Sequence, residues 1–365
     1  KESSAASDVY KRQVVTYLLW DTCYTLCDAP IFALPTAMTS SVKERSGFMT
    51  VGTVGGSLAA ALATVFLVPY AENNGYLKAA IIVAVVSFLA MSLISLFGKE
   101  RYKVKEEVLE KPASLRDTWE YLIHNKYLLY FYAYRMISGS IAVSMLIYVA
   151  KYCLGDVKYM SMVVAISVIP ICILFLFSGK IFKRFDKIVV YRFCMIATIL
   201  MNAITLFVGY QNRTLAIACL VVIAVLAILP SILMGAIPQD CVEYGTYKTE
   251  TRKEGITFAL QTFANKLTAA VATIITGGVL TFVGYDVAAE KAATEAHKVV
   301  EIAVSQATVS GMWKASFIVP IIGQLLAIGF LFAYNLRDKD VQIMSDCNAG
   351  KITKAEAEAL LSRKY

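Results

Sequence analysis

Apolar runs of about 20 residues recur along this chain, and they constrain its fold more than any other feature. A helix of that length crosses the ~30 Å hydrocarbon core of a bilayer, and a backbone without internal hydrogen bonds cannot face lipid. The 58% share of hydrophobic residues and the mean hydropathy of +0.61 fit this interpretation. We therefore predict an all-α polytopic membrane protein. Its nine expected spans are Val14–Met38, Phe48–Pro69, Leu77–Phe97, Tyr127–Ala150, Tyr159–Ser178, Ile188–Gly209, Leu215–Pro238, Ile256–Val283 and Met312–Tyr334.

The net charge of +8 is explained by membrane topology rather than by nucleic-acid binding. Basic residues gather in alternate loops, and basic loops stay on the cytoplasmic side of a membrane. This predicts a multi-pass membrane protein with a cytoplasmic C-terminus. The basic residues of the expected inner loops and tail are Lys43, Arg45, Lys99, Arg101, Lys103, Lys105, Lys180, Lys183, Arg184, Lys248, Arg252, Lys253, Arg337 and Lys339, and those of the outer loops are Lys151, Lys158, Arg213, Lys291 and Lys298.

The segments outside the spans divide the chain further. Residues 1–13 resemble a translated sequencing adapter, so we expect the natural chain to begin upstream of Val14; a natural polar N-terminus is the alternative. Residues 99–126 form a charged linker that ends in an expected amphipathic helix after Ser114, lying on the membrane surface or on a partner protein. In the tail, residues 337–365, Thr353 and Glu356 form a capping-box pattern that predicts a short helix.

Two charged residues lie near the middle of apolar runs, Asp28 in the first expected span and Lys266 in the eighth. Such a charge costs roughly 2.5–3.5 kcal/mol on insertion scales, so it usually faces a polar site inside the protein. Because the two charges are opposite and belong to separate spans, we predict a shared site near the midplane. This pattern is typical of transporters.

Aromatic side chains accompany Asp28. Trp20, Tyr24 and Asp28 are spaced by four residues and therefore share a helix face, which Phe32 continues one turn later. An aromatic ring beside a carboxylate suits a sugar, whose apolar face packs on the ring while its hydroxyls donate to the carboxylate. The alternative is a lipid-facing aromatic stripe with a structural aspartate.

Charged and polar residues also surround Lys266. Gln261 and Thr262 lie about one turn before it and are expected to line the same site. Asp240 and Glu243 share a face at the inner end of the preceding span, and Arg252 follows in the turn. Opposite charges there could pair in one state and part in another, which describes a gate. For the basic residues, ordinary positive-inside decoration is the alternative.

No metal or catalytic constellation is apparent. The eight cysteines are scattered through apolar segments without a Cys-x-x-Cys, and the two histidines are isolated. We expect no cofactor, no metal and no enzymatic activity.

Several motifs resemble the glycoside–pentoside–hexuronide:cation symporters of the major facilitator superfamily, especially the melibiose-carrier branch. VTYLLW followed by YTLCDAP resembles that family's fourth helix, and PTAMTSSVKER resembles the inner loop after it. The segment from DCVEYG to LQTFANK resembles its tenth loop and eleventh helix, and YCLGD and GYD also fit.

The resemblance implies two six-helix bundles, of which this chain holds helices four to twelve. Residues 14–98 would complete the first bundle, and residues 127–336 would form the second. It further implies roles for residues by position. Asp28, Trp20, Tyr24, Phe32, Lys266, Gln261 and Thr262 would bind substrate, Thr25 would join the cation site, and Asp240, Glu243 and Arg252 would work the inner gate.

The chain also departs from that branch. Phe32, Thr53 and Ser231 stand where its members carry a tryptophan, a sugar-binding arginine and an aromatic residue. Arg135, inside the fourth expected span, is a candidate for the missing guanidinium; a snorkelling or interhelical structural role is the alternative.

The function expected from the resemblance is symport of a sugar or glycoside with a monovalent cation, sodium or proton, through the lipid bilayer. A non-transporting sugar receptor, or a carrier of non-sugar cargo such as a lysolipid, remains an alternative. The nine-span piece alone is not expected to transport.

Overall fold

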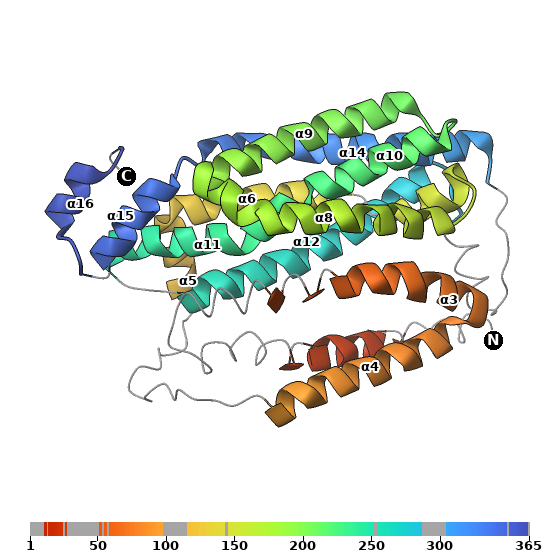
Figure 1. Cartoon of the computed structure of the whole chain (residues 1–365), viewed down its shortest axis with the longest axis horizontal. Coiled ribbons are helices and arrows are strands. Elements are labelled where there is room, and N and C mark those ends of the chain that lie inside the picture. Colours follow the sequence, from red (N-terminus) through yellow and green to blue (C-terminus); the bar gives the residue numbers. More distant parts are fainter. Residues whose placement is uncertain are drawn as a thin grey trace. The chain divides into compact units, whose positions relative to one another are not determined.

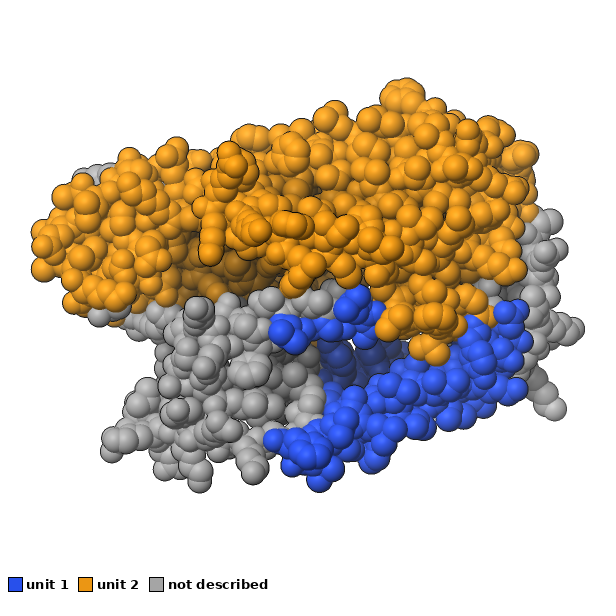
Figure 2. Space-filling view, viewed as in Figure 1, with its two compact units in different colours: residues 1–60, 70–111 blue, residues 61–69, 112–365 orange. Residues whose placement is uncertain are grey.

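The computed structural model describes residues 11–12, 14–24, 26–27, 51–52, 55–56, 58–97, 115–142, 145–250, 254–286, 304–348 and 350–363. The chain forms two compact units, residues 1–60 with 70–111 and residues 61–69 with 112–365, which Figure 2 colours separately. Each unit is described by itself below. Within the described residues every regular element is a helix, as the sequence predicts.

The smaller unit contains the helical residues 14–24 and α4 (Tyr76–Phe97). Its predicted span Leu77–Phe97 is confirmed as a helix. Before α4 in the chain come the π-helix η1 (Ala63–Leu67), which belongs to the larger unit, and α3 (Val68–Asn74), whose residues from Tyr70 onward belong to the smaller one. About half of the predicted span Val14–Met38, residues 25 and 28–38, lies outside the described residues.

The larger unit is a bundle of long, roughly antiparallel helices, shown in Figure 1. Its helices, in chain order, are α5 (Leu115–His124), α6 (Lys126–Ser140), α7 (Leu146–Tyr148), η3 (Val149–Cys153), α8 (Lys158–Arg184), α9 (Lys187–Val208), α10 (Arg213–Leu226), α11 (Ile228–Thr249), α12 (Glu254–Phe282), α14 (Gln306–Ala333), α15 (Asp338–Asn348) and α16 (Lys354–Leu360). Helix α6 packs against both α12 and α14, and α11 packs against α9, α12 and α15.

Across the described residues, six helices are long and apolar enough to cross a membrane. They are Tyr76–Leu93, Lys158–Arg184, Lys187–Val208, Arg213–Thr249, Ala259–Phe282 and Gln306–Ala333. A shorter apolar helix covers Leu58–Ala71. These helices coincide with predicted spans, so the apolar runs located them correctly.

The span predicted over Tyr127–Ala150 is not a single helix in the described residues, because α6 ends at Ser140 and a new helix begins at Leu146. Helix α6 ends in Ser138, Gly139 and Ser140, and glycine and serine are poorer helix formers than alanine or leucine. The amide of Ala142 then bonds to the carbonyl of Gly139, three residues back, instead of continuing the α-helical pattern. The hydropathy of the run did not reveal this interruption.

Both short helices predicted outside the spans are confirmed. Helix α5 buries Tyr121 while Trp119 and Ile123 remain 64% and 54% exposed, as an amphipathic surface helix would. Helix α16 begins at the predicted capping box: the Thr353 hydroxyl accepts from the amide of Glu356, and the Glu356 carboxylate accepts from the amide of Thr353.

Two apolar clusters hold the larger unit together. One lies around α5, the first half of α6, the start of α9 and the length of α11, and contains Leu128, Phe131 and Leu233. The other surrounds η3, α10 and the start of α14, and contains Met145 and Trp313. Helices α9 and α14 contribute to both, whereas α6 belongs to the first and η3 to the second.

Candidate functional site

The predicted site residues fall in both units. Asp28, Phe32, Thr25 and Arg252 lie outside the described residues, so nothing is said of their placement. In the smaller unit the Trp20 and Tyr24 rings stack with centroids 5.7 Å apart and planes inclined by 19°. The four-residue spacing thus makes them neighbours on one helix. Their role in binding stays a prediction.

A polar band lies on α12 and the facing side of α6. We define it as Gln261, Thr262, Asn265 and Lys266 on α12 with Arg135 on α6. Thr262, Asn265 and Lys266 are exposed on the larger unit, and Arg135 and Gln261 are half-buried. All five residues are in or beside apolar helices, where lipid is a poor environment for charge. The band is therefore better suited to line a water-filled path than to face lipid.

Arg135 and Asn265 join the two helices directly. The Arg135 guanidinium donates a hydrogen bond of 3.3 Å to Oδ1 of Asn265. Asn265 was missed by the sequence reasoning, although it lies four residues after Gln261 and therefore on the same face as it. The neighbour of Asn265 in the chain is Lys266, so the band contains two cationic residues, Arg135 and Lys266.

Close packing of α6 on α12 supports this contact. A Cβ added at Gly139, one turn beyond Arg135, would lie 2.5 Å from Cγ2 of Thr268. Only a glycine lets the α6 backbone approach α12 this closely, as small residues do at contacts between membrane helices. Gly139 and Thr268 thus set the separation at which Arg135 reaches Asn265.

Gln261 supplies a hydrogen bond that the neighbouring helix α11 lacks. Pro238 in α11 has no N–H, so the carbonyl of Met234, four residues earlier, loses its usual helical partner. The Gln261 amide donates a hydrogen bond of 3.2 Å to that carbonyl. Its Oε1 atom is buried and has no hydrogen-bond partner within the described structure. Gln261 therefore fastens α12 to α11 and still offers an acceptor.

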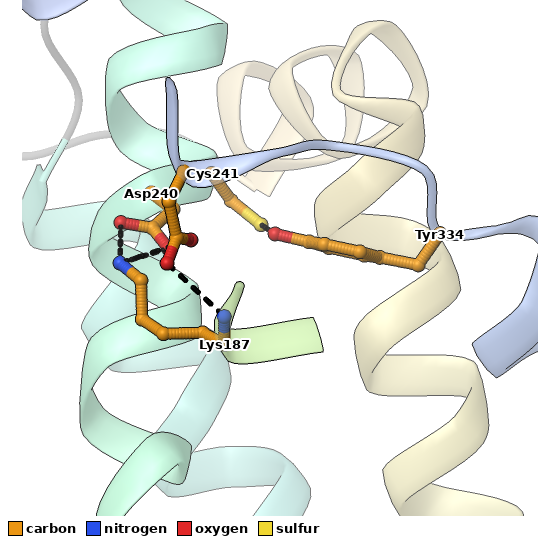
Figure 3. A network of polar contacts seen from close by, with 5 residues as sticks. Lys187, Asp240, Cys241 and Tyr334 are labelled. Atoms are coloured by element: carbon orange, nitrogen blue, oxygen red, sulfur yellow. Dashed lines mark hydrogen bonds and ion pairs between the residues drawn. The ribbon is translucent and has the colours of Figure 1, made fainter. Parts of the chain in front are cut away.

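A second polar group, the inner cluster, consists of Lys187, Asp240 and Asp338. Lys187 Nζ lies 2.7 Å from Oδ1 and 2.5 Å from Oδ2 of Asp240, and 3.7 Å from Oδ1 of Asp338. The backbone amide of Lys187 also donates to Oδ2 of Asp338 at 3.0 Å. Figure 3 shows this network, in which Lys187 comes from the start of α9 and Asp240 from α11.

The inner cluster sits in partly dehydrated surroundings. The side chains of Lys187, Asp240 and Asp338 are 21%, 13% and 28% exposed. Burial raises the pKa of Asp338, and the Lys187 ammonium opposes that rise. Beside the cluster, Cys241 Sγ lies 3.6 Å from the buried Tyr334 hydroxyl (Figure 3). One ammonium between two carboxylates leaves a negative charge in excess.

The gate residue Glu243 contacts the tail of the chain. Asn348, at the end of α15, donates to the Glu243 carbonyl at 3.0 Å and to its Oε2 at 2.9 Å. Lys354 pairs with Glu250 at 2.9 Å, and this contact lowers the pKa of Glu250. Fully buried Asp340 accepts from the amide of Ser362. The tail is therefore fastened to the end of α11.

The expected pairing of Asp240 and Glu243 with basic residues of the following turn stays a prediction, because Arg252 and Lys253 lie outside the described residues. Among the described residues Asp240 pairs with Lys187, which begins another helix. Lys187, Asp338 and Asn348 were not identified as site residues because sequence separation hides their proximity to α11. A basic residue at a helix start beside an inner loop was the available signal for Lys187.

Among the described residues, no group of three or more His, Cys, Asp or Glu side chains is placed to hold a metal ion. The contacts found at the polar band and beside Lys187 are hydrogen bonds and ion pairs.

Comparison with known proteins decides the family. Residues 9–338 match the family model described as MFS/sugar transport protein. The chain belongs to this family. It is a multi-pass membrane protein of a sugar-transporter family rather than an enzyme, and the resemblance inferred from its motifs is confirmed at that level.

Several curated relatives agree with this assignment. The chain is 26% identical over 332 residues to a protein of Escherichia coli provisionally named a sulfoquinovose importer, covering 88% of this chain and 68% of that protein. It is 27% identical over 280 residues to an uncharacterized symporter of Bacillus subtilis, covering 74% of this chain and 60% of that protein. A lactose permease of Lactobacillus delbrueckii is 25% identical over 272 residues, covering 70% of this chain and 43% of that protein.

Proposed function

We propose that the chain is part of a cation-coupled symporter that carries a sugar or glycoside across a bacterial inner membrane by alternating access. The observation that carries this proposal is the polar band, in which Arg135 and Lys266 lie on two packed helices of a sugar-transport family chain. Charged side chains inside membrane helices generally face a substrate or ion pathway. The C-terminal tail would lie in the cytoplasm.

The proposed substrate site combines the two sets of predicted residues. Asp28 would accept hydrogen bonds from substrate hydroxyls, and the stacked Trp20 and Tyr24, with Phe32, would pack on the apolar face of the ring. Thr25 would belong to the cation site. From the larger unit, Lys266, Gln261, Thr262 and Arg135 would complete the lining.

The inner cluster and the tail contacts supply a physical basis for a gate. Lys187 joins α9 to Asp240 of α11, and Asn348 joins α15 to Glu243 of α11. Exchange between inward-open and outward-open states needs contacts that form in one state and part in the other. We assign that role to Asp240 and Glu243, with Arg252 as a further member, and add Lys187 to them.

Coupling would follow from linkage. A cation that improves sugar binding must itself bind more tightly when the sugar is present, by the same factor. The relatives' names include both a sulfonated sugar, sulfoquinovose, and a neutral disaccharide, lactose. These names therefore support a sugar as the transported solute, but they do not indicate whether that sugar is charged.

The test is uptake of labelled sugars by the full-length gene product that contains this chain, reconstituted in vesicles with a sodium gradient, a proton gradient or neither. Accumulation that depends on one gradient is expected. Sugar binding without accumulation under either gradient would contradict the symporter and favour a receptor. Transport of a lysolipid instead of a sugar would show that the cargo is not a sugar.

Asp28→Asn tests the site. It should lower sugar affinity at least about tenfold, because a charge-assisted hydrogen bond is worth roughly 1.5–3 kcal/mol, while leaving membrane insertion intact. Asp346→Asn, the same change at the tail surface where Asp346 pairs with Lys351, is the control. Equal affinities for the two variants would remove Asp28 from the site.

A further inference from the structure

Two tyrosines from the motifs YCLGD and GYD lie against each other at one end of the larger unit. We call Tyr152, which begins YCLGD, and Tyr285, the middle residue of GYD, the tyrosine pair. Their hydroxyl oxygens are 3.0 Å apart and share a hydrogen bond, and their ring centroids are 5.5 Å apart. Tyr148 packs edge-on against the same Tyr285 ring, also with centroids 5.5 Å apart. Two motifs whose tyrosines are 133 residues apart in the sequence therefore meet at one contact.

The tyrosine pair ends a line of contacts between two stretches of chain that run in the same direction. Near the other end of this line, the Tyr132 hydroxyl of α6 donates to the carbonyl of Thr257 in α12 at 2.7 Å. The contact of Arg135 with Asn265 follows along the same two helices. The polar band thus lies between the Tyr132 contact and the tyrosine pair. At 1.5 Å per residue, the end of α12 is roughly 25 Å beyond Asn265.

Beyond the polar band the two stretches of chain have different neighbours. Helix α6 packs along α12, whereas η3, which follows the interruption after Ser140, packs against α14 and α8. The tyrosine pair joins η3 to the segment that follows α12. In the proposed orientation this end faces the outside of the cell, because Lys151 and Lys158 belong to an expected outer loop.

Tyr285 is fixed in place, and Tyr152 is the partner that can move. Tyr285 is 3% exposed and follows a left-handed turn at Gly284, whose φ is +82°. The Tyr285 amide donates to the carbonyl of Leu280 at 3.0 Å, and the Thr308 hydroxyl donates to the carbonyl of Gly284 at 3.4 Å. Tyr152 is half-buried and belongs to the π-helix η3, a rare geometry that is frequent at functional sites. Movement of the Tyr152 side chain is therefore enough to separate the pair.

We propose that the tyrosine pair is an outer gate, which closes the path from the outside to the polar band. This inference rests on the proposed function and adds a gate at the end of the bundle opposite the inner cluster. Packed aromatic rings exclude water and sugar, while one neutral hydrogen bond shifts an equilibrium by only about 2- to 10-fold. The gate can therefore open in every transport cycle. Because the pair is roughly 25 Å from the band, it controls access and does not contact a sugar bound there.

The test measures how fast a reagent added outside reaches the face of α12 that carries Lys266. Thr273 is exposed on the larger unit and lies two turns beyond Lys266 on that face. Thr273→Cys, in a cysteine-free form of the full-length protein, is therefore the reporter. Tyr152→Phe removes the hydroxyl and keeps the ring, and it should speed labelling by a membrane-impermeant thiol reagent about 2- to 10-fold.

A second variant and a matched control accompany this change. Tyr285→Phe should speed labelling equally, and the double variant should add nothing further, because both changes remove the same hydrogen bond. Tyr285→Phe also tests the gate if Tyr152→Phe does not fold. Tyr210→Phe is the control and should label like the parent. Tyr210 is half-buried, packs on the same apolar cluster as Tyr152, and contacts Trp313 with ring centroids 5.6 Å apart.

The outcomes separate the gate from the proposed function. Equal labelling rates for Tyr152→Phe and Tyr210→Phe overturn the gate, and so does an absence of labelling at Thr273→Cys in every variant. Sugar affinity at equilibrium should match that of the parent. A lower affinity of Tyr152→Phe with unchanged labelling places Tyr152 in sugar binding and overturns the gate. Faster labelling of a protein that accumulates no sugar overturns the symporter and leaves the tyrosine pair as the closure of a water-filled path.

Discussion

At the scale of single residues, partners come from helices that the sequence does not bring together. The carbonyl of Met234 lacks its helical donor because Pro238, four residues later, has no N–H. The side-chain amide of Gln261, from another helix, donates to this carbonyl instead. Lys187 serves two carboxylates that lie 53 and 151 residues further along the chain. Each of these contacts can be tested by exchanging one side chain.

Gln261→Met should lower the free energy of unfolding by about 1–2 kcal/mol, because it leaves the Met234 carbonyl without a donor. Pro238→Ala restores an N–H at that carbonyl, so adding it should recover part of the loss. The measurement is a double-mutant cycle on thermal stability in detergent. Additive effects of the two changes would show that they do not share a hydrogen bond.

The pH dependence of stability should report on Asp338. Its folded pKa is raised above the ordinary value of 3.8, chiefly by burial. A raised acid binds its proton more tightly in the folded state, so the contribution of Asp338 to stability falls as pH rises from 3.8 through the folded pKa. Removing the opposing ammonium with Lys187→Met should make that fall steeper, and Asp338→Asn should flatten it.

Melting temperatures of the two variants and the parent, measured across that acidic range, check this expectation. The comparison between variants is needed because other carboxylates titrate there too. Superimposable pH profiles for the parent and Asp338→Asn would contradict it.

At the scale of helices, α6 and α12 are held at a separation that only small residues permit. The contact of Gly139 with Thr268 lies one turn beyond the contact of Arg135 with Asn265. A substitution that changes the Gly139–Thr268 contact should therefore also change the Arg135–Asn265 contact. The apolar pattern predicted that helices lie here, but it contained no information on how close they come.

Gly139→Ala should destabilise the protein by about 1–3 kcal/mol, the usual cost of overpacking, because its Cβ would lie 2.5 Å from Cγ2 of Thr268. Thr268→Ser removes that methyl group, so the double variant should regain much of the loss. Thermal stability and sugar affinity of the single and double variants measure both effects. A double variant no better than Gly139→Ala would place the strain elsewhere.

At the scale of the whole molecule, periodicity and hydropathy predicted the helical class and the positions of the spans Lys158–Arg184 and Lys187–Val208 within a few residues. The capping box of α16 was also predictable, because Thr353 and Glu356 act within one turn. The break after Ser140 was not predicted, because only the hydropathy of the run was considered and not the weak helix formers Ser138, Gly139 and Ser140. The partners of Asp240 and Glu243 could be identified only from the tertiary fold, because they are distant in the sequence. The roles of Asp28 and Lys266 remain predictions.

The alternation of basic loops makes a prediction about the entire chain. Gln211, before α10, and Ala359, in α16, are exposed and belong to expected outer and inner faces. In a cysteine-free background, Gln211→Cys should react with a membrane-impermeant thiol reagent added outside cells, and Ala359→Cys only after the membrane is opened. Labelling of both from outside would contradict the proposed orientation.

The interruption between α6 and α7 has a mechanical consequence. A helix resists bending because its backbone hydrogen bonds must stretch or break, and at Ala142, whose amide bonds to the carbonyl of Gly139, the regular α-helical pattern has already ended. On either side of this interruption the chain is anchored in a different apolar cluster, through Leu128 and Phe131 before it and Met145 and Val149 after it. A hinge at Ala142 would let one end of the bundle tilt while the other kept its packing, within two turns of Arg135.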